Sequence, residues 1–316
     1  MDVYEALLGQ DTAVQLLQQA VKLERVAPAY LFYGCSGVGK SIVAKGFIQV
    51  LLTVDLSPDK CSLAQRKLNK GNHPDLLWVE PTYLSKGKIY TASAAAVQGL
   101  KFKTPPKIRI EQIRRITQFL NRPALEATRQ VVVIEDAQTM AEEPANALLK
   151  TLEEPGNATL ILIAPDTDSL LTTLVSRCQK IQFYPLSEVN LKTVLERNGY
   201  QAILEYPEII AIAQGSPGKA IAAWEILQTI PNELLKQLKG AIATPLDAIK
   251  LAKNIASELD SSTQLWLVDY LQYYYWQQNH QVRLMQQWEK TRQYLLSYVQ
   301  PRLIWECTLL SLLQVE

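Results

Sequence analysis

Residues 31–41 read Leu-Phe-Tyr-Gly-Cys-Ser-Gly-Val-Gly-Lys-Ser, and this stretch decides the fold. Gly34, four further residues and then Gly39-Lys40-Ser41 form the pattern of a phosphate-binding loop. In such a loop backbone N–H groups surround the phosphates, the lysine reaches their β and γ oxygens, and the serine hydroxyl reaches Mg²⁺. The glycines at 34, 37 and 39 meet a geometric need, because they adopt backbone angles that side chains forbid and let the backbone approach an anion closely.

The residues on either side of this loop supply its expected setting. Residues 29–33 are a short apolar run typical of a strand, and residues 41–52 have apolar positions at helical spacing. The loop therefore joins a strand to the N-terminus of a helix, where anions bind. An empty glycine-rich turn is the bland alternative, but the strand and the helix together favour a site for ATP or ADP with Mg²⁺.

A second apolar run ends in two carboxylates. Residues 131–134 are Val-Val-Val-Ile, as expected of a strand buried on both faces, and Glu135 and Asp136 follow directly. In proteins with this loop the first such acid typically supports Mg²⁺, here together with Ser41, and the next can position the attacking water. Residues 159–164 are another fully apolar run. Strands that alternate with helices predict a parallel α/β sheet.

The other segments are predicted from the same patterns. A helix is expected over 11–24, capped by Asp11 or Thr12, and a strand over 76–80. Residues 81–107 are predicted to be a solvated loop, although their lysines could touch phosphates. Beyond Pro185 no strand is evident, and helical spacing continues almost to the end of the chain.

Composition limits the function classes. The 316 residues carry a formal net charge of +1, so no overall basic field holds nucleic acid, and two or three domains are expected. No apolar stretch is long enough to span a bilayer and the start lacks the layout of a signal peptide, so we expect no membrane contact and a cytoplasmic location. The four cysteines are far apart and are expected to be free thiols.

Several stretches together resemble one protein family. They occur in the family's order over about the first 180 residues and are Leu8-Gly9-Gln10, Ala29-Tyr30-Leu31-Phe32, His73-Pro74-Asp75-Leu76, Ile110 to Ile113 with Arg114, Asn146-Ala147-Leu148-Leu149-Lys150-Thr151-Leu152-Glu153-Glu154-Pro155, and Ser176-Arg177-Cys178. The chain thereby resembles the clamp-loader branch of the AAA+ ATPases, which in bacteria includes the gamma/tau and delta-prime subunits of DNA polymerase III.

The resemblance implies a fold, a set of domains and a set of partners. An α/β P-loop domain of the AAA+ type with a RecA-like parallel sheet would span residues 1–184. A small helical lid (185–226) and an all-α collar for oligomerisation (227–316) would follow. The partners would be the gamma/tau and delta subunits and, through the complex, the sliding clamp and primer-template DNA.

The resemblance also assigns roles to two residues outside the loop. Gln10 would belong to the nucleotide site. Arg177 would be an arginine finger that acts in trans on a neighbouring subunit's ATP, a task for which its planar, permanently charged guanidinium is suited. From the residues alone, Arg177 could equally be a partner in a structural ion pair.

Three catalytic groups depart from those of the active members of this family. Glu135-Asp136 reverses the usual Asp-Glu order, which displaces each carboxylate by on the order of 1 Å, and such a misplacement can lower a rate roughly 100-fold. Ala164 and Pro165 replace a polar γ-phosphate sensor, and Gly218 replaces an arginine in the lid. The combination favours a subunit of the delta-prime type that binds nucleotide but hydrolyses it weakly or not at all.

A fourth departure concerns zinc. Relatives commonly carry four cysteines between the loop helix and the His-Pro-Asp-Leu stretch, but this chain has only Cys61 there. One thiolate and His73 cannot complete a four-ligand site, so we expect no structural zinc.

Three hypotheses follow from the sequence. The first is a clamp-loader subunit within the DNA polymerase III holoenzyme, which completes a neighbour's ATP site and helps to load the clamp on primed DNA. The second is a self-sufficient ATPase motor of the gamma type. The third is an interaction protein with a relic loop, in which the aromatic run Tyr270, Tyr273, Tyr274, Tyr275 and Trp276, with Trp266 before it and Trp288 after it, stacks on bases or fills a partner's groove. The helical spacing of Trp266, Tyr270 and Tyr273 favours packing in a helical core or an oligomer interface instead.

Overall fold

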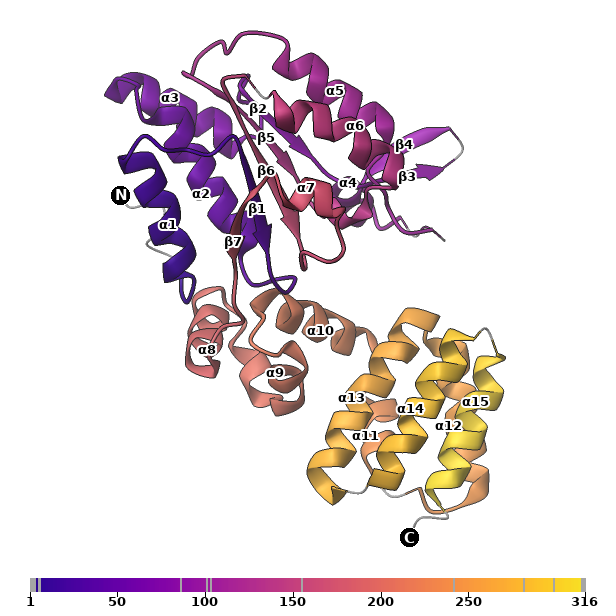
Figure 1. The fold of residues 1–316 in the computed structure, drawn as a ribbon. Helices are drawn as coiled ribbons and strands as arrows, with labels where there is room; N and C mark the ends of the chain where they lie inside the picture. The colour runs from indigo at the N-terminus through magenta and orange to yellow at the C-terminus, as the bar shows by residue number, and fades with distance from the viewer. Residues whose placement is uncertain are drawn as a thin grey trace. The chain divides into compact units, whose positions relative to one another are not determined.

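The chain divides into two compact units. The computed structural model describes residues 4, 7–85, 87–100, 102, 104–154, 156–240, 242–280, 282–297 and 299–313 (Figure 1). The first unit comprises residues 1–186 and the second residues 187–316. The finer division into 1–184, 185–226 and 227–316 stays a prediction.

The first unit is built on a parallel five-stranded sheet with the order β2-β5-β6-β1-β7. Its strands are β1 (Ala29–Tyr33), β2 (Leu76–Val79), β5 (Gln130–Ile134), β6 (Ala158–Ala164) and β7 (Gln179–Gln182). The central strands β5 and β6 are buried along their whole length, as the apolar runs in the sequence predicted.

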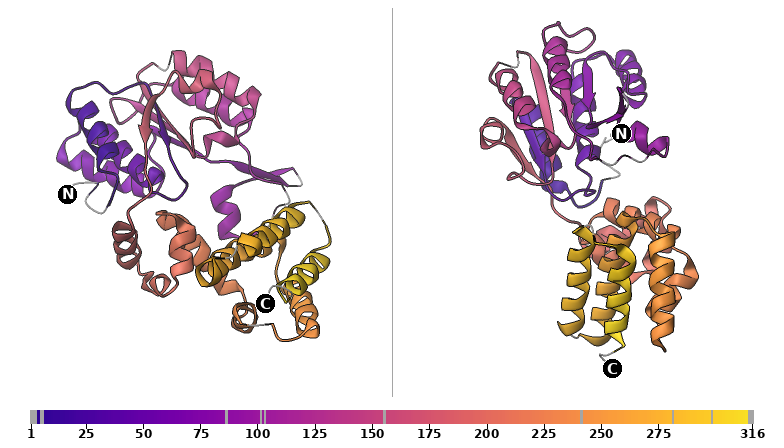
Figure 2. Two further views of the ribbon diagram at one scale, coloured as in Figure 1. Left: turned by 60° about the horizontal axis from the view of Figure 1, so that its bottom comes forward. Right: turned by 90° about the vertical axis from the view of Figure 1, so that its right-hand side faces the viewer.

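Helices cover both faces of this sheet (Figures 1 and 2). On one face lie α1 (Asp11–Lys22), α2 (Lys40–Thr53) and α3 (Pro58–Asn69), and on the other lie α5 (Ile110–Leu120), α6 (Glu142–Glu153) and α7 (Thr172–Val175). Side chains alternate along β1, so that Tyr30 and Phe32 pack under α2 while Leu31 packs toward α5 and α6. Each face of the sheet therefore has its own hydrophobic core.

Two details of the predicted elements were wrong. Helix α1 begins after Gln10, whose side chain makes no cap, instead of being capped by Asp11 or Thr12. Strand β7 was missed because it reads Gln-Lys-Ile-Gln and buries only Ile181. An edge strand with one solvated face and a single apolar residue gives no periodic signal.

The prediction of a solvated loop over 81–107 was also wrong. This segment forms the antiparallel hairpin of β3 (Thr82–Ser85) and β4 (Lys88–Thr91), followed by α4 (Ala92–Val97). One face of the hairpin is covered by Phe102, which stacks on Tyr83 with ring centroids 4.3 Å apart. On the other face, Leu84 and Ile89 are paired across the strands and are 52% and 58% exposed.

Asp75 fastens a long connection of the first unit. Its carboxylate accepts hydrogen bonds from the backbone N–H groups of Leu125, Glu126 and Ala127 at 2.7, 2.8 and 2.8 Å. The carboxylate is buried and forms these bonds between the start of β2 and the segment that leads into β5. The His-Pro-Asp stretch therefore has a structural role in holding two neighbouring strands in place.

The second unit is entirely helical in its described residues. Its helices are α8 (Glu188–Arg197), η2 (Gln201–Glu205), α9 (Pro207–Ala213), α10 (Pro217–Thr229), α11 (Asn232–Lys239), α12 (Pro245–Glu258), α13 (Ser261–Asn279), α14 (Val282–Leu296) and α15 (Pro301–Leu312). Side chains of Ser187, Ser216, Thr244 and Asp260 cap four of them, each accepting a backbone N–H three residues on. Proline in the first turn of several helices suits their N-termini.

Several aromatic residues of the second unit lie in its core. Tyr270, Trp288 and Trp305 are fully buried, and Trp266 stacks on Tyr270 with ring centroids 5.2 Å apart. The hydroxyl of Tyr275 donates to the carbonyl oxygen of Leu238 at 2.7 Å. Burial raises the pKa of this Tyr275 hydroxyl to about 12. Of the three residues at helical spacing, Tyr270 is buried and Trp266 and Tyr273 are half-buried, which agrees with packing inside this helical unit.

We predict that Asp75→Ala lowers the free energy of unfolding by about 3 kcal/mol, because three backbone donors lose a charged acceptor and each such bond contributes roughly 1.5–3 kcal/mol before water replaces part of it. Urea unfolding followed by circular dichroism measures this change.

The matched control is Asp55→Ala. Asp55 accepts one exposed bond from Thr128 at 3.0 Å, so its loss should cost less than about 1 kcal/mol. Equal losses in the two variants would contradict the role given to Asp75.

Candidate nucleotide-binding site

The candidate site lies where the parallel strands end. Gly34 follows β1, Glu135 follows β5, Pro165 follows β6 and Phe183 follows β7. Because the strands are parallel, these residues meet at the same edge of the sheet, which is where open α/β sheets bind ligands. The loop of residues 34–39 then leads into the N-terminus of α2.

The backbone of the loop requires glycine. Gly34, Gly37 and Gly39 have φ values of +143°, +79° and +102°. A Cβ atom on Gly34 would lie closer than 3.0 Å to the carbonyl oxygen of Phe183, and the Gly34 N–H donates to the carbonyl oxygen of Pro165 at 3.1 Å. The start of the loop is therefore packed against the ends of β6 and β7.

Lys40 is folded back onto the loop. Its ammonium group donates to the carbonyl oxygens of Gly34 and of Cys35, the latter at 2.8 Å, and the side chain is buried. These acceptors are neutral. Phosphate oxygens form stronger, charge-assisted bonds with an ammonium group. A phosphate bound in the loop could therefore replace these two carbonyl oxygens as the acceptors of Lys40.

Ser41 and Glu135 are joined directly. The Ser41 hydroxyl donates to Oε1 of Glu135 at 2.7 Å, and the indole N–H of Trp78 donates to Oε2 at 3.0 Å. A hydroxyl and a carboxylate are hard oxygen ligands of the kind that Mg²⁺ prefers. These two residues, which the sequence paired as the metal side of the site, are brought together by the fold.

Asp136 differs from its neighbour. It is exposed and its backbone is left-handed, with a φ of +47°, and its carboxylate accepts a bond from the side-chain amide of Gln138 at 3.2 Å. Its backbone carbonyl accepts bonds from the N–H and the hydroxyl of Thr139, the last residue of the turn η1 (Ala137–Thr139). Asp136 thus takes part in a tight turn at the end of β5.

Gln10 ties the start of the chain to the loop. It is 3% exposed, and its side-chain amide donates to the carbonyl oxygens of Tyr184 at 2.7 Å and of Val38 at 3.2 Å. Its side-chain oxygen accepts the Tyr184 N–H at 3.3 Å. Gln10 therefore contacts the loop backbone and the residue after Phe183 at once, and its role toward a nucleotide stays a prediction.

Arg177 donates to two acceptors on α6 and α7, the helices that cover the face of the sheet opposite α2. Its guanidinium donates to Oε1 of Glu153, the last residue of α6, at 2.6 Å and to the carbonyl oxygen of Thr173 in α7 at 3.0 Å. The two side chains are 37% and 50% exposed. Next to it Cys178 is buried, and burial raises the pKa of its thiol to about 11, so it stays protonated at neutral pH.

The remaining positions named from the sequence lie as follows. Ala164 ends β6 and is buried, while Gly218 lies in the first turn of α10 in the second unit. Cys61 contacts the carbonyl oxygens of Thr53 and Leu56, and no group of three or more His, Cys, Asp or Glu in the described part of the chain is placed to hold a metal ion. The absence of structural zinc stays a prediction.

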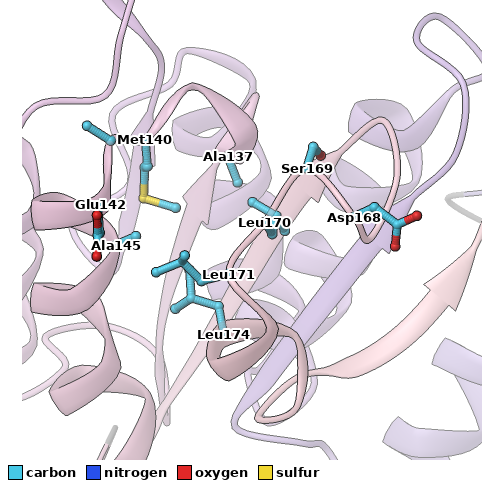
Figure 3. A pocket seen from close by; sticks show the side chains of 10 residues that line it. Ala137, Met140, Glu142, Ala145, Asp168, Ser169, Leu170, Leu171 and Leu174 are labelled. Atoms are coloured by element: carbon cyan, nitrogen blue, oxygen red, sulfur yellow. The ribbon is translucent and has the colours of Figure 1, made fainter.

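A separate cleft of about 250 Å³ opens on the α6 side of the sheet (Figure 3). It lies between Ala137, Met140 and Ala145 on one side and Leu170 and Leu174 on the other. Its lining is mostly aliphatic, and none of the site residues named from the sequence belongs to it.

The family of the chain follows from comparison with known proteins. A family model described as DNA polymerase III, delta subunit, matches residues 9–187, and a model described as the C-terminal domain of cyanobacterial DNA polymerase III delta prime matches residues 189–312. The chain belongs to the delta-prime family of DNA polymerase III clamp-loader subunits. The two matches meet where the structure divides into two units.

Two delta-prime relatives illustrate the likeness. The delta' subunit of Bacillus subtilis is 30% identical over 180 residues, which are 56% of this chain and 48% of that protein. The delta' subunit of Pseudomonas aeruginosa is 32% identical over 196 residues, which are 60% and 54%. The chain thus matches about half the length of these relatives, and tau and gamma subunits are among its further relatives.

A solved structure supports the fold. The crystal structure of a gamma subunit-related protein of DNA polymerase III from Thermotoga maritima aligns with a TM-score of 0.50 at 17% identity, covering 95% of this chain and 97% of that one. The predicted fold class, an AAA+ type P-loop domain followed by helical domains, is confirmed. Within the described residues, no helix has the length and apolar character needed to span a membrane.

Sequence reasoning missed two residues of this site. Trp78 was included only as part of a predicted strand, and Glu153 only as part of a family motif. Nothing in their spacing to Glu135 or Arg177 indicates a contact, since the partners are 57 and 24 residues apart.

We predict that Gly34→Ala destabilises the first unit by at least about 3 kcal/mol, because both the left-handed backbone and the clash with the Phe183 carbonyl act against a Cβ atom. Gly71→Ala is the control, since Gly71 has a φ of +67° but open space around its Cβ position. It should lose only about 1 kcal/mol. Thermal unfolding compares the two, and a tolerated Gly34→Ala would contradict the close packing of the loop.

Proposed function

We propose that this chain is the delta-prime type subunit of a clamp loader, which assembles with gamma/tau and delta subunits in the bacterial cytoplasm. It holds a nucleotide with Mg²⁺, turns it over weakly or not at all, and supplies Arg177 to the ATP site of a neighbouring subunit. In this way it helps to load the sliding clamp on primer-template DNA.

The observation that carries this proposal is the state of Arg177. Its guanidinium is partly exposed and donates to acceptors from α6 and α7, elements that do not contain Lys40, Ser41 or Glu135. A permanent cation that is fixed near the surface, apart from the chain's own phosphate loop, is suited to stabilise charge on a partner's γ-phosphate.

Nucleotide binding is supported by the fit of the loop. Three glycines with positive φ, a buried lysine held beside the loop and the Ser41–Glu135 pair supply the donors and the metal ligands that a bound nucleotide needs. Bound Mg²⁺ would neutralise phosphate charge, and Ser41 and Glu135 would hold it. Lys40 would exchange two carbonyl acceptors for phosphate oxygens.

Weak turnover is supported by what surrounds the loop. Both carboxylate oxygens of Glu135 accept hydrogen bonds, one from Ser41 and one from Trp78, so this acid is suited to hold Mg²⁺ and not to activate water. Asp136 is exposed in a tight turn. Ala164 offers no side-chain donor at the end of β6. The alternative is a self-sufficient ATPase motor of the gamma type, and the intact loop and acid pair favour it. The next experiment distinguishes this alternative from our proposal.

We predict that Arg177→Ala lowers the clamp- and DNA-stimulated ATPase of the complex assembled with gamma/tau and delta by tenfold or more, since an arginine finger contributes roughly 10³- to 10⁵-fold to phosphoryl transfer at its site. Arg177→Lys should not restore turnover, because lysine lacks the planar fork.

Lys40→Ala and the exposed Arg66→Ala are the comparison variants, and both should change turnover less than about twofold if the chain only completes a neighbour's site. A larger loss with Lys40→Ala than with Arg177→Ala would identify the chain as a motor and refute the proposal.

We further predict that Mg-ADP protects Cys35 from thiol reagents. Cys35 is exposed within the phosphate loop, so a nucleotide seated there should slow its modification about tenfold or more when bound near saturation. The exposed Cys307 in the second unit should react equally with and without nucleotide.

Mass spectrometry of the labelled peptides gives both rates. Lys40→Ala should remove the protection of Cys35. Labelling of Cys35 that is indifferent to Mg-ADP in the unmodified chain would mean that the loop is a relic.

A further inference from the structure

The acid at the end of β5 is a glutamate, one methylene longer than an aspartate, and both of its carboxylate oxygens have partners. Oε1 of Glu135 accepts the Ser41 hydroxyl, and Oε2 accepts the indole N–H of Trp78. One carboxylate therefore links helix α2 to strand β2. An aspartate at this position has one methylene less with which to reach both donors.

The position of Trp78 follows from the register of the sheet. Trp78 pairs with Val133 in the neighbouring strand, and Val131 and Val133 face the core under α2. Alternation along the chain then places Glu135 on that same face. The Trp78 ring packs against this core, and the ammonium group of Lys45, one turn after Ser41 on α2, lies 5.7 Å from the ring centre.

The indole has a single donor and no acceptor, so its bond to Glu135 fixes one direction of approach. The ring itself is held by the sheet and by α2, whereas the glutamate side chain would otherwise sample several rotamers. Trp78 thus removes rotamer freedom from Glu135, the acid whose carboxylate accepts the Ser41 hydroxyl.

We propose that Trp78 is a positioning residue for the metal side of the nucleotide site: it orients Glu135 toward Ser41, so that the hydroxyl and the carboxylate are already arranged when Mg²⁺ arrives with the nucleotide. This inference rests on the nucleotide-binding part of the proposed function and is independent of Arg177. It accounts for a glutamate at this position, since the longer acid reaches the serine and the indole together.

The test measures ADP affinity of the purified chain by isothermal titration calorimetry, once with Mg²⁺ and once with EDTA. The readout is the factor by which Mg²⁺ strengthens ADP binding. Trp78→Phe keeps an aromatic ring but removes the donor, and we expect this factor to fall about tenfold while affinity in EDTA stays the same. Trp224→Phe, which alters a ring packed on Tyr206 in the second unit, should change neither affinity.

A double-mutant cycle separates positioning from general damage. Glu135→Asp should itself reduce the Mg²⁺ factor, and Trp78→Phe should then add little, because the bond it removes is already lost. Trp78 is the only tryptophan of the first unit, so the difference in emission between the unmodified chain and Trp78→Phe reports on it, and this difference should change when Mg-ADP is added.

Two results would overturn the inference. An unchanged Mg²⁺ factor in Trp78→Phe, even with lower stability, would leave Trp78 as a packing residue only. If the unmodified chain does not bind ADP, or binds it equally well with and without Mg²⁺, then Ser41 and Glu135 do not form a metal site and the inference fails. The role proposed for Arg177 would not be affected, because it is tested in the complex. Conversely, a silent Arg177→Ala would leave the Trp78 result standing.

Discussion

The phosphate-binding loop lies directly against the ends of its own sheet, and the rest of the site depends on this contact. The space for a side chain at Gly34 is taken by the carbonyl of Phe183 after β7, and the Gly34 N–H is bound by the carbonyl of Pro165 after β6. Gln10 adds bonds to Val38 and Tyr184. The loop is thereby fixed by the backbone after β6, by the backbone after β7 and by the side chain of Gln10, which reduces the entropy lost when a ligand orders it.

In the proposed site, binding and turnover would depend on different residues. The groups that would hold a nucleotide, namely the glycines, Lys40 and Ser41, come from one short stretch of sequence and are joined to Glu135 by the fold. Asp136 is exposed in a tight turn and Ala164 offers no side-chain donor, which under this proposal weakens the activation of water and the sensing of a γ-phosphate. A site can keep its binding geometry while losing catalysis, because catalysis needs interactions that strengthen only in the transition state.

The sequence predicted those parts of the fold and site whose signals are local. The central strands were visible as β-branched runs, and the loop as spaced glycines with Lys40. Strand β7 was not visible, because an edge strand with one buried isoleucine lacks a period. The hairpin of β3 and β4 was missed for a related reason: it is short, and one of its faces is solvated, so Leu84 and Ile89 read as residues of a polar loop. Trp78 was missed because its partner Glu135 is brought near only by the pairing of β2 with β5.

The ion pair of Arg177 with Glu153 joins the two stretches that most strongly indicated the family, since Glu153 is the first glutamate of the Leu-Leu-Lys-Thr-Leu-Glu-Glu-Pro segment and Arg177 is the centre of Ser-Arg-Cys. Because both side chains are partly exposed, such a pair contributes only about 0–1 kcal/mol. The pair therefore orients the guanidinium, but little free energy is needed to break it. A partner's γ-phosphate, which carries more charge than one carboxylate and matches the planar fork, can draw Arg177 away at little cost. A strong buried pair in the same place would fix the arginine and oppose that transfer, so the exposure of this contact is itself an argument for the proposed finger.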